Sequence, residues 1–389
     1  MMAENNKVYT ALGDIGTELR AAVDISPGDV LFREPAFAFA CEDEDDDDSL
    51  PAIVQVAMNA LEVEDNATSS RTFKDLTATA EDNDDAQKNA LFAWGAEQIL
   101  SKLTNQDLVM KTSKDDVVEA IRRVALNTFT VKSLIETEIA FEDALENDDL
   151  DLVHCVIEIG AEDPRGVGLY ILASAANHSC APNTFVTFDS NNEITFRATK
   201  SIKAHEAITI SYGPVVGVDG NVHQRREEIL ESHCFHCQCA ACVAETTAIA
   251  ATTNSADDFE AMEFIENVIV GGNFTASEAL QKAMNAPENI VQSSMFGKAM
   301  ADTSIQSIGF DVEIAIGFQK LALKSLELRC PTDHVAIAYD ILRVCLLRVC
   351  DGEKNDRKEI ERARGILSQY YGEEYAYKQT LDAFSRNSS

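Results

Sequence analysis

A cluster of cysteines near residue 240 has a spacing that indicates metal binding. Cys237, Cys239 and Cys242 form a Cys-x-Cys-x-x-Cys motif. Three thiolates this close together suit tetrahedral zinc, and a structural zinc site has four ligands. The candidates for the fourth ligand are Cys234, His233, His236 and the distant Cys180. The alternative is that the thiols stay reduced and pack as small hydrophobic side chains. The motif favours one structural zinc ion.

Two further stretches carry side chains suited to binding or catalysis. Residues 177–180 read Asn-His-Ser-Cys and place an amide, an imidazole, a hydroxyl and a thiol in consecutive positions. Tyr212 ends the segment 207–212, which reads as a strand. Taken singly, His178 is explained by a satisfied core histidine and Tyr212 by packing on a half-buried strand. Only a wider pattern can assign these residues a role.

The acidic composition restricts the partners of the chain. Its 389 residues carry 66 Asp and Glu against 32 Lys and Arg, a net charge of −34. Nucleic acid and anionic membranes are bound by cationic segments, so we expect neither as a direct partner. A negative field attracts cationic partners, although acidity also serves solubility.

Two features of the sequence bear on its location. No apolar run approaches the ~18 residues that span a bilayer. Residues 1–7 lack the apolar stretch of a signal peptide. We therefore expect a cytoplasmic or nuclear protein, in which cysteines stay reduced.

The elements that must position these residues change from strands to helices along the chain. Residues 1–40 and 166–215 read as short strands, and the segments 184–188, 193–197 and 207–212 are the clearest. Helices are expected at 88–103 and at 115–126, the second capped by Ser113. Acidic stretches at 42–48 and 142–151 are expected to be solvated surface segments. After residue 242 we expect antiparallel helix pairs, with helices at 311–328, 334–350, 356–370 and 373–384.

Three segments, in this order, resemble the signatures of SET-domain methyltransferases. Asn-His-Ser-Cys-Ala-Pro-Asn at 177–183 resembles the first signature, Ile-Thr-Ile-Ser-Tyr-Gly at 208–213 the second, and Phe-His-Cys-Gln-Cys-Ala-Ala-Cys at 235–242 the post-SET motif. Segments at 16–28, 127–131 and 168–170 are similar to the SET-and-MYND-domain family in particular. The resemblance implies an α+β fold. Its parts are a SET β-fold with a post-SET zinc site, a helical insertion and an α-helical C-terminal domain of TPR-like helical hairpins.

The resemblance also implies a division of the chain. N-terminal SET strands occupy 1–40, an acidic loop and helical insertion 41–126, the SET core 127–232, the post-SET zinc motif 233–245 and the helical C-terminal domain 246–389. The MYND finger of the family binds zinc through Cys and His residues placed between the opening strands and the SET core. Residues 41–110 contain only Cys41 and no His, so we expect that finger to be absent.

The activity implied by the resemblance is transfer of a methyl group from S-adenosylmethionine to lysine side chains of proteins. Tyr212 is implied as the catalytic residue, and Phe129 and His233 would line the substrate channel. The residues implied to bind the cofactor are Gly16, Asn127, Ser174, Asn177, His178, Tyr212 and Phe235. The implied zinc ligands are Cys180, Cys237, Cys239 and Cys242.

Three departures from the family pattern motivate an alternative. Ile15 stands where Arg or Lys is usual, Glu18 replaces the second glycine of Gly-x-Gly-Leu, and His233 stands where an aromatic residue is common. The alternative is a non-catalytic SET module that binds partners through its helical C-terminal domain. For the enzyme we expect a monomer that acts on a protein substrate, either a basic one such as a histone or another protein.

Overall fold

The computed structural model describes residues 7–13, 16–41, 50–63, 72–76, 86–102, 113–134, 149–251, 257–330, 333–373, 375–386 and 388. The chain divides into two compact units that interleave along the sequence. The first unit comprises residues 1–133, 163–212 and 227–237, and the second comprises 134–162, 213–226 and 238–389. Of the helices that the structure describes, none is long and apolar enough to cross a membrane.

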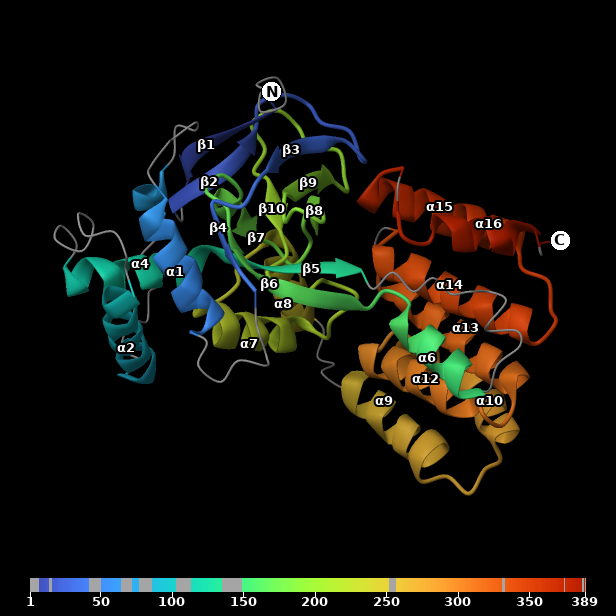
Figure 1. The fold of residues 1–389 in the computed structure, drawn as a ribbon. Coiled ribbons are helices and arrows are strands. Elements are labelled where there is room, and N and C mark those ends of the chain that lie inside the picture. Colours follow the sequence, from blue (N-terminus) through green and yellow to red (C-terminus); the bar gives the residue numbers. More distant parts are fainter. Residues whose placement is uncertain are drawn as a thin grey trace. The chain divides into compact units, whose positions relative to one another are not determined.

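The described strands of the first unit form several small sheets (Figure 1). Strands β1 (Val8–Gly13) and β2 (Gly16–Ala21) pair as an antiparallel hairpin. Strands β3 (Val30–Glu34), β9 (Ile194–Ala198) and β8 (Thr184–Phe188) form an antiparallel sheet with β9 in the centre. In another sheet β6 (Glu162–Leu169) lies between β4 (Ala38–Ala40) and β5 (Thr128–Leu134). The short strands β7 (Asn177–His178) and β10 (Thr209–Ile210) pair in parallel.

The core of these sheets is built from inward-facing strand residues. Leu19, Phe32 and Phe196 are fully buried, and the rings of Phe32 and Phe196 stack with their centroids 4.5 Å apart. Burying one such side chain stabilises a fold by about 1.5–3 kcal/mol. Tyr170 is buried in the same cluster, and its hydroxyl donates a hydrogen bond to the Asn192 carbonyl at 2.6 Å. The core therefore fixes the strands that lead into the first signature.

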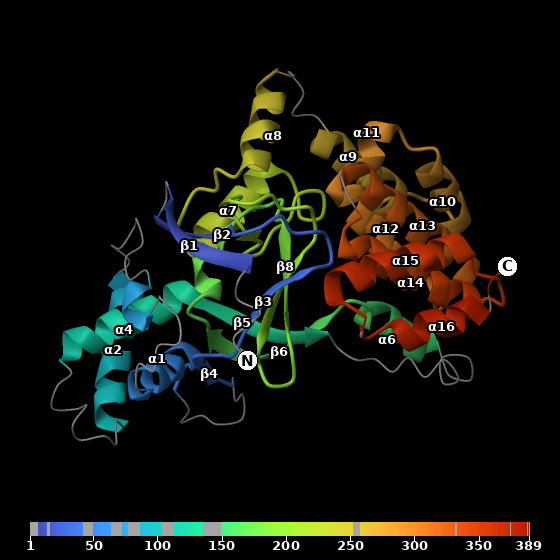
Figure 2. The same ribbon diagram turned by 90° about the horizontal axis from the view of Figure 1, so that it is seen from above.

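A helical layer covers a separate core in the first unit. It contains α1 (Ala52–Glu62), a 3₁₀ turn η2 (Phe73–Asp75), α2 (Ala86–Lys102) and α4 (Lys114–Asn127). Figures 1 and 2 show α1, α2 and α4 beside one another. The predicted cap of α4 is confirmed, because Ser113 Oγ accepts a hydrogen bond from Asp116 N at 3.2 Å. Its apolar face is buried as the periodicity predicts, with Ile121 and Val124 fully covered.

The second unit consists mainly of helices (Figure 2). After α7 (Val222–His233), which begins in this unit, its helices are α8 (Ala240–Ala251), α9 (Asp257–Ile265), a π-helical turn η4 (Glu266–Val270), α10 (Ala276–Met284), α11 (Glu288–Val291), α12 (Ser294–Ser307), α13 (Val312–Arg329), α14 (Val335–Cys350), α15 (Arg357–Tyr371) and α16 (Lys378–Arg386). Helices α12 to α15 pack consecutively, each against the next. This is the succession of helix pairs that the sequence predicts.

A helix from the middle of the chain completes the second unit. Helix α6 (Asp149–Glu158) is bound at its C-terminal end by Arg343 of α14, which donates to the Val156 carbonyl at 3.1 Å and also to the Ile159 carbonyl. Just beyond the helix, Gly160 N donates to Tyr377 Oη at 2.7 Å. The two bonds from Arg343 satisfy carbonyls that the end of a helix leaves without partners.

The expected α+β architecture with its helical C-terminal part is confirmed, but several boundaries differ from prediction. The strand expected at 207–212 is reduced to β10 because its partner β7 has only two residues. The helix expected from 373 begins at Lys378, because Tyr375 and Tyr377 are buried from a turn instead. Residues 149–151, expected as the end of an acidic surface segment, begin α6. The acidic residues 42–48 and 142–148 lie outside the described residues.

Candidate functional site: a ring cluster and a four-cysteine centre

Four half-buried rings meet in the first unit, and we call them the ring cluster: Tyr212, His178, His233 and Phe235. The Tyr212 ring lies 5.0 Å from His233 and 5.4 Å from His178, measured between centroids. Phe235 stands edge-on to Tyr212 at 6.4 Å with an interplanar angle of 89°. The rings come from β7, from the segment after β10 and from the end of α7 with the residues that follow. The second signature, the first signature and the post-SET motif are therefore brought together.

The backbone and the side chain of Tyr212 are each held by a hydrogen bond. Its hydroxyl donates to the Ala176 carbonyl at 2.8 Å. Its backbone N–H donates to His178 Nδ1 at 3.1 Å. The phenol oxygen is thus held next to a backbone carbonyl oxygen, and both oxygens lie beside the ring cluster.

His178 links Tyr212 to the cysteine centre. Because Nδ1 accepts from Tyr212 N, the neutral ring carries its proton on Nε2. Nε2 lies 3.2 Å from Cys180 Sγ and donates to that sulfur. Hydrogen bonds of this kind orient a metal ligand and set its basicity. One imidazole therefore positions both a candidate catalytic residue and a candidate metal ligand.

Asn183, the last residue of the first signature, fixes β10. Its side-chain nitrogen donates to the Ala207 carbonyl at 2.8 Å, and its side-chain oxygen accepts from Thr209 N at 2.9 Å. The residue is 8% exposed. An amide offers one acceptor and two donors in a fixed plane, so it can replace a missing strand on both sides of residue 208. This explains why two ladder positions suffice to hold the strand before Tyr212.

Four thiols converge next to the ring cluster. The sulfur atoms of Cys180, Cys237, Cys239 and Cys242 all lie within 4.8 Å of one another. Cys180 Sγ and Cys237 Sγ are 3.8 Å apart. Tetrahedral Zn²⁺ with Zn–S bonds of about 2.3 Å requires S···S separations of roughly 3.8 Å. The donor set and its spacing therefore fit a structural zinc ion, with no ligand position left for a substrate.

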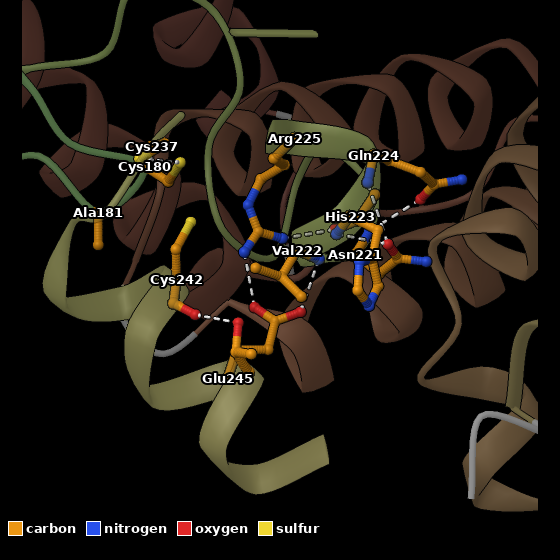
Figure 3. A network of polar contacts seen from close by, with 12 residues as sticks. Cys180, Ala181, Asn221, Val222, His223, Gln224, Arg225, Cys237, Cys242 and Glu245 are labelled. Carbon is orange, nitrogen blue, oxygen red and sulfur yellow. Dashed lines mark hydrogen bonds and ion pairs between the residues drawn. The ribbon is translucent and has the colours of Figure 1, made fainter. Parts of the chain in front are cut away.

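A buried ion pair fastens the helix that carries Cys242 (Figure 3). Arg225 on α7 is 1% exposed and donates to Glu245 of α8 at 2.6 Å and to the Gly220 carbonyl at 2.8 Å. The other carboxylate oxygen of Glu245 accepts from Val222 N at 2.9 Å, so it caps the start of α7. Cys242 lies one turn before Glu245 on α8. The pair therefore holds the cysteine helix against α7.

The N-terminal hairpin presents an open backbone at Gly16. Its φ is +109°, and a Cβ added there would meet no atom of the described residues within 4 Å. Two residues on, Glu18 is 9% exposed, and its carboxylate accepts from Arg20 Nε at 2.6 Å. Arg20 in turn donates to the His205 carbonyl. The negative charge of Glu18 is thus paired on the hairpin, while Ile15 lies outside the described residues.

The remaining residues implied by the resemblance are placed as follows. Asn127 ends α4, is buried and donates to the Arg123 carbonyl at 2.7 Å. Ser174 lies in a 3₁₀ turn, η3 (Ala173–Ala175), and Phe129 packs edge-on against Tyr170 at 5.7 Å. Asn177 pairs with Thr209 across the parallel strands.

Sequence reasoning missed several residues that build this site. The Ala176 carbonyl has no side-chain signal. Glu34 accepts from the backbone N–H groups of Leu172 and Ala173 at 2.9 and 2.8 Å and so caps the turn that carries Ser174. Arg225 and Glu245 carry a weak signal, because a buried arginine calls for a carboxylate partner. Nothing in the sequence indicates that these two residues meet.

The small strands, the parallel pairing of the two signatures and the four-cysteine centre define a SET-type β-fold. The chain belongs to the SET domain family, because the model of that family matches residues 16–213.

Among curated proteins, the Arabidopsis thaliana histone-lysine N-methyltransferase ASHR1 is 39% identical over 79 residues, which are 20% of this chain and 16% of that protein. The Mus musculus protein-lysine N-trimethyltransferase SMYD5 is 38% identical over 82 residues, or 21% of this chain and 20% of that protein. The Mus musculus histone-lysine N-methyltransferase SMYD3 is 28% identical over 137 residues, or 35% of this chain and 25% of that protein. The matches thus span a quarter or less of these relatives.

Among solved structures, the SET domain of LSMT bound to lysine and AdoHcy aligns over 99% of this chain and 88% of that chain. The TM-score is 0.38 and the identity 13%, a likeness too low to support an inference.

Proposed function

We propose that this SET-domain chain is an S-adenosylmethionine-dependent protein-lysine N-methyltransferase. The observation that carries the proposal is the ring cluster, in which the Tyr212 hydroxyl is held 2.8 Å from the Ala176 carbonyl beside three other rings. Its support from relatives is that proteins named as lysine methyltransferases match this chain.

The cofactor supplies a methyl group on a sulfonium when it is bound. The open backbone at Gly16 fits a ligand that approaches where a Cβ would otherwise stand. Asn177 would hold the cofactor by backbone and side-chain hydrogen bonds, and Phe235 would cover its adenine. His178 would contribute its backbone, because both of its ring nitrogens are already hydrogen-bonded. Asn127 and Ser174 complete the proposed set. These roles come from the matching positions of the family signatures.

We propose that aromatic rings line the lysine side of the site. Aromatic faces attract an ammonium group, and a desolvated slot lowers the pKa of the amine toward its reactive neutral form. We assign Tyr212 to orienting the amine, with Phe129 and His233 as walls of the channel. Because displacement at the methyl carbon is in-line, fixing the position of the amine supplies much of the rate.

The four-cysteine centre has a structural role in this proposal. Zinc bound by Cys180, Cys237, Cys239 and Cys242 would fix the post-SET segment that carries Phe235 and His233. Because His178 is hydrogen-bonded to both Cys180 and Tyr212, fixing Cys180 would also fix the position of Tyr212. We further propose that the protein is a monomer without a MYND finger and that it acts in the cytoplasm or nucleus. Its substrate would be a protein, which would be basic if it is a histone, and neither nucleic acid nor membrane would be a direct partner.

Labelled S-adenosylmethionine and a cell lysate test the proposal. Tyr212→Phe is expected to lower methyl transfer about 10²–10³-fold, the range found when one preorganised hydrogen-bond donor is removed from an active site. Tyr9→Phe is the matched control, because Tyr9 is an exposed tyrosine of the β1–β2 hairpin. Zinc-replete protein that shows no cofactor binding by calorimetry would refute the proposal. That result would favour a non-catalytic module that binds partners through its helical C-terminal domain.

A further inference from the structure

His233 differs chemically from the wall residue it replaces. An aromatic wall has no group that accepts a proton near neutral pH, whereas an imidazole does. The His233 ring lies 5.0 Å from the Tyr212 ring and 6.5 Å from Phe235, so it belongs to the same half-buried cluster as the candidate catalytic hydroxyl. Its position in the cluster makes its protonation state relevant to any amine that enters.

The hydrogen bonds around His233 define which nitrogen is bare. Ser232 Oγ donates its only proton to the Glu228 carbonyl at 2.6 Å. His233 Nδ1 lies 2.7 Å from the same oxygen. Since the hydroxyl proton is already used, Nδ1 must donate to Ser232 Oγ. The neutral ring then carries its proton on Nδ1, and among the described residues no group is hydrogen-bonded to Nε2, which keeps its lone pair.

The surroundings keep this ring neutral. Burial lowers the pKa of His233 below its ordinary value of 6.5. Of the described titratable groups, the Tyr212 ring lies 5.0 Å from it, His178 lies on the other side of the same contact with Tyr212, and Cys234 is the next residue in the chain. On its own helix the charged groups nearest in sequence are Glu228 and Glu231. At neutral pH the bare Nε2 is therefore available as a base.

We propose that His233 Nε2 is the general base that takes the proton from the substrate lysine. The inference rests on the proposed lysine methyltransferase function and deepens it. The N–H bond of the lysine ammonium breaks, a new N–H bond forms at Nε2, and the electron pair stays on the lysine nitrogen. That pair would then attack the methyl carbon of the bound cofactor: the new N–C bond would form as the C–S bond breaks, and the electrons of the C–S bond would stay on sulfur, which would leave as a neutral thioether. The imidazolium returns its proton to water, so one proton leaves the site for each methyl transferred.

A base of this kind has a defined pH signature. The neutral form of His233 is favoured, so the wild-type rate should be level from pH 9 down to pH 7 and fall only below pH 6.5 as the ring becomes protonated. Without the base, the lysine must lose its proton to water, and the rate should rise with pH toward the pKa of the amine. A general base contributes about 10²–10⁴-fold to a rate.

The test compares His233→Tyr with His223→Tyr on a lysine peptide from pH 5.5 to 10. His223 lies on the same helix and is exposed. We expect His233→Tyr to lose at least about 10²-fold at pH 7 and to regain up to roughly tenfold per pH unit above it, whereas His223→Tyr keeps the wild-type profile. A His233→Tyr enzyme with the wild-type rate and profile overturns the inference.

A second measurement needs no activity. Nitrogen-15 NMR of histidine-labelled protein reports the tautomer, and resonances assigned by loss in His233→Tyr should show a protonated Nδ1 and a bare Nε2. A proton on Nε2 at pH 7.5 overturns the inference even in an active enzyme. Failure of the wild type to methylate any lysine overturns the proposed function instead, so the two failures are distinguishable.

Discussion

The ion pair between Arg225 and Glu245 is a contact of the site whose loss we expect to destabilise the fold strongly. The substitution Glu245→Met leaves the guanidinium, whose side chain is 2% exposed, without its carboxylate. It also removes the acceptor of Val222 N–H at the start of α7. Breaking a buried ion pair costs about 3–5 kcal/mol. Because the Glu245 side chain is 31% exposed, we expect the lower end, about 3 kcal/mol, or roughly a hundredfold in the folding equilibrium.

The double variant Arg225→Met/Glu245→Met distinguishes the effect of an unpaired buried charge from the effect of changed side-chain volume. When both charged groups are replaced by apolar ones, no charge is left buried, so most of the loss should be recovered. Urea unfolding of the zinc-loaded proteins, followed by circular dichroism, measures each free energy of unfolding. The rate of zinc release to a chelator is the second readout, since Cys242 is one turn from Glu245 on α8.

An exposed pair in the same unit is the control. Asp382 accepts from Arg364 Nη1 at 2.9 Å, and its side chain is 58% exposed. Asp382→Ala should cost only about 0–1 kcal/mol. A Glu245→Met variant as stable as this control, or a double variant no more stable than Glu245→Met, would show that the pair does not hold α8 in the way described.

Two further predictions follow from the site. Asn183→Ala should lower the free energy of unfolding by about 1–3 kcal/mol, because it removes the side-chain partner of Thr209 N–H and of the Ala207 carbonyl. Thermal unfolding measures this loss, and a shift no larger than that of the exposed control Asn191→Ala would contradict the prediction. Native mass spectrometry should find one zinc per chain, reduced in Cys242→Ser and unchanged in Cys155→Ser, and any other stoichiometry would refute the four-cysteine site.

Local signals in the sequence predicted local structure well. Ser113 and Asp116 are three residues apart, so the cap of α4 could be identified without knowledge of the rest of the fold. The length of the strand before Tyr212 could not be predicted in this way, because it depends on β7 and on the side chain of Asn183, both some 30 residues away. Propensity describes what a segment prefers, and pairing with distant segments decides where it ends.

The cysteine centre shows the same limit. The spacing of Cys237, Cys239 and Cys242 indicates zinc by itself, but residue types alone left four candidates for the fourth ligand. Only the resemblance to SET proteins singled out Cys180, 57 residues before Cys237, and the structure groups its thiol with the other three. The roles of these residues remain predictions. The tautomer of His233 lay beyond the sequence altogether, because it depends on where a serine hydroxyl points.

The docking of α6 has a consequence for synthesis of the chain. Its partner Arg343 is made 184 residues after Ile159, and Tyr377 follows Gly160 by 217 residues. At translation rates of about 5–20 residues per second, roughly 10–40 s pass before these partners exist. During that interval the C-terminal end of α6 lacks the Arg343 guanidinium that binds its carbonyls, and Gly160 lacks the Tyr377 hydroxyl. Slowing translation of the C-terminal half should therefore lengthen the time for which α6 is open to proteases and chaperones.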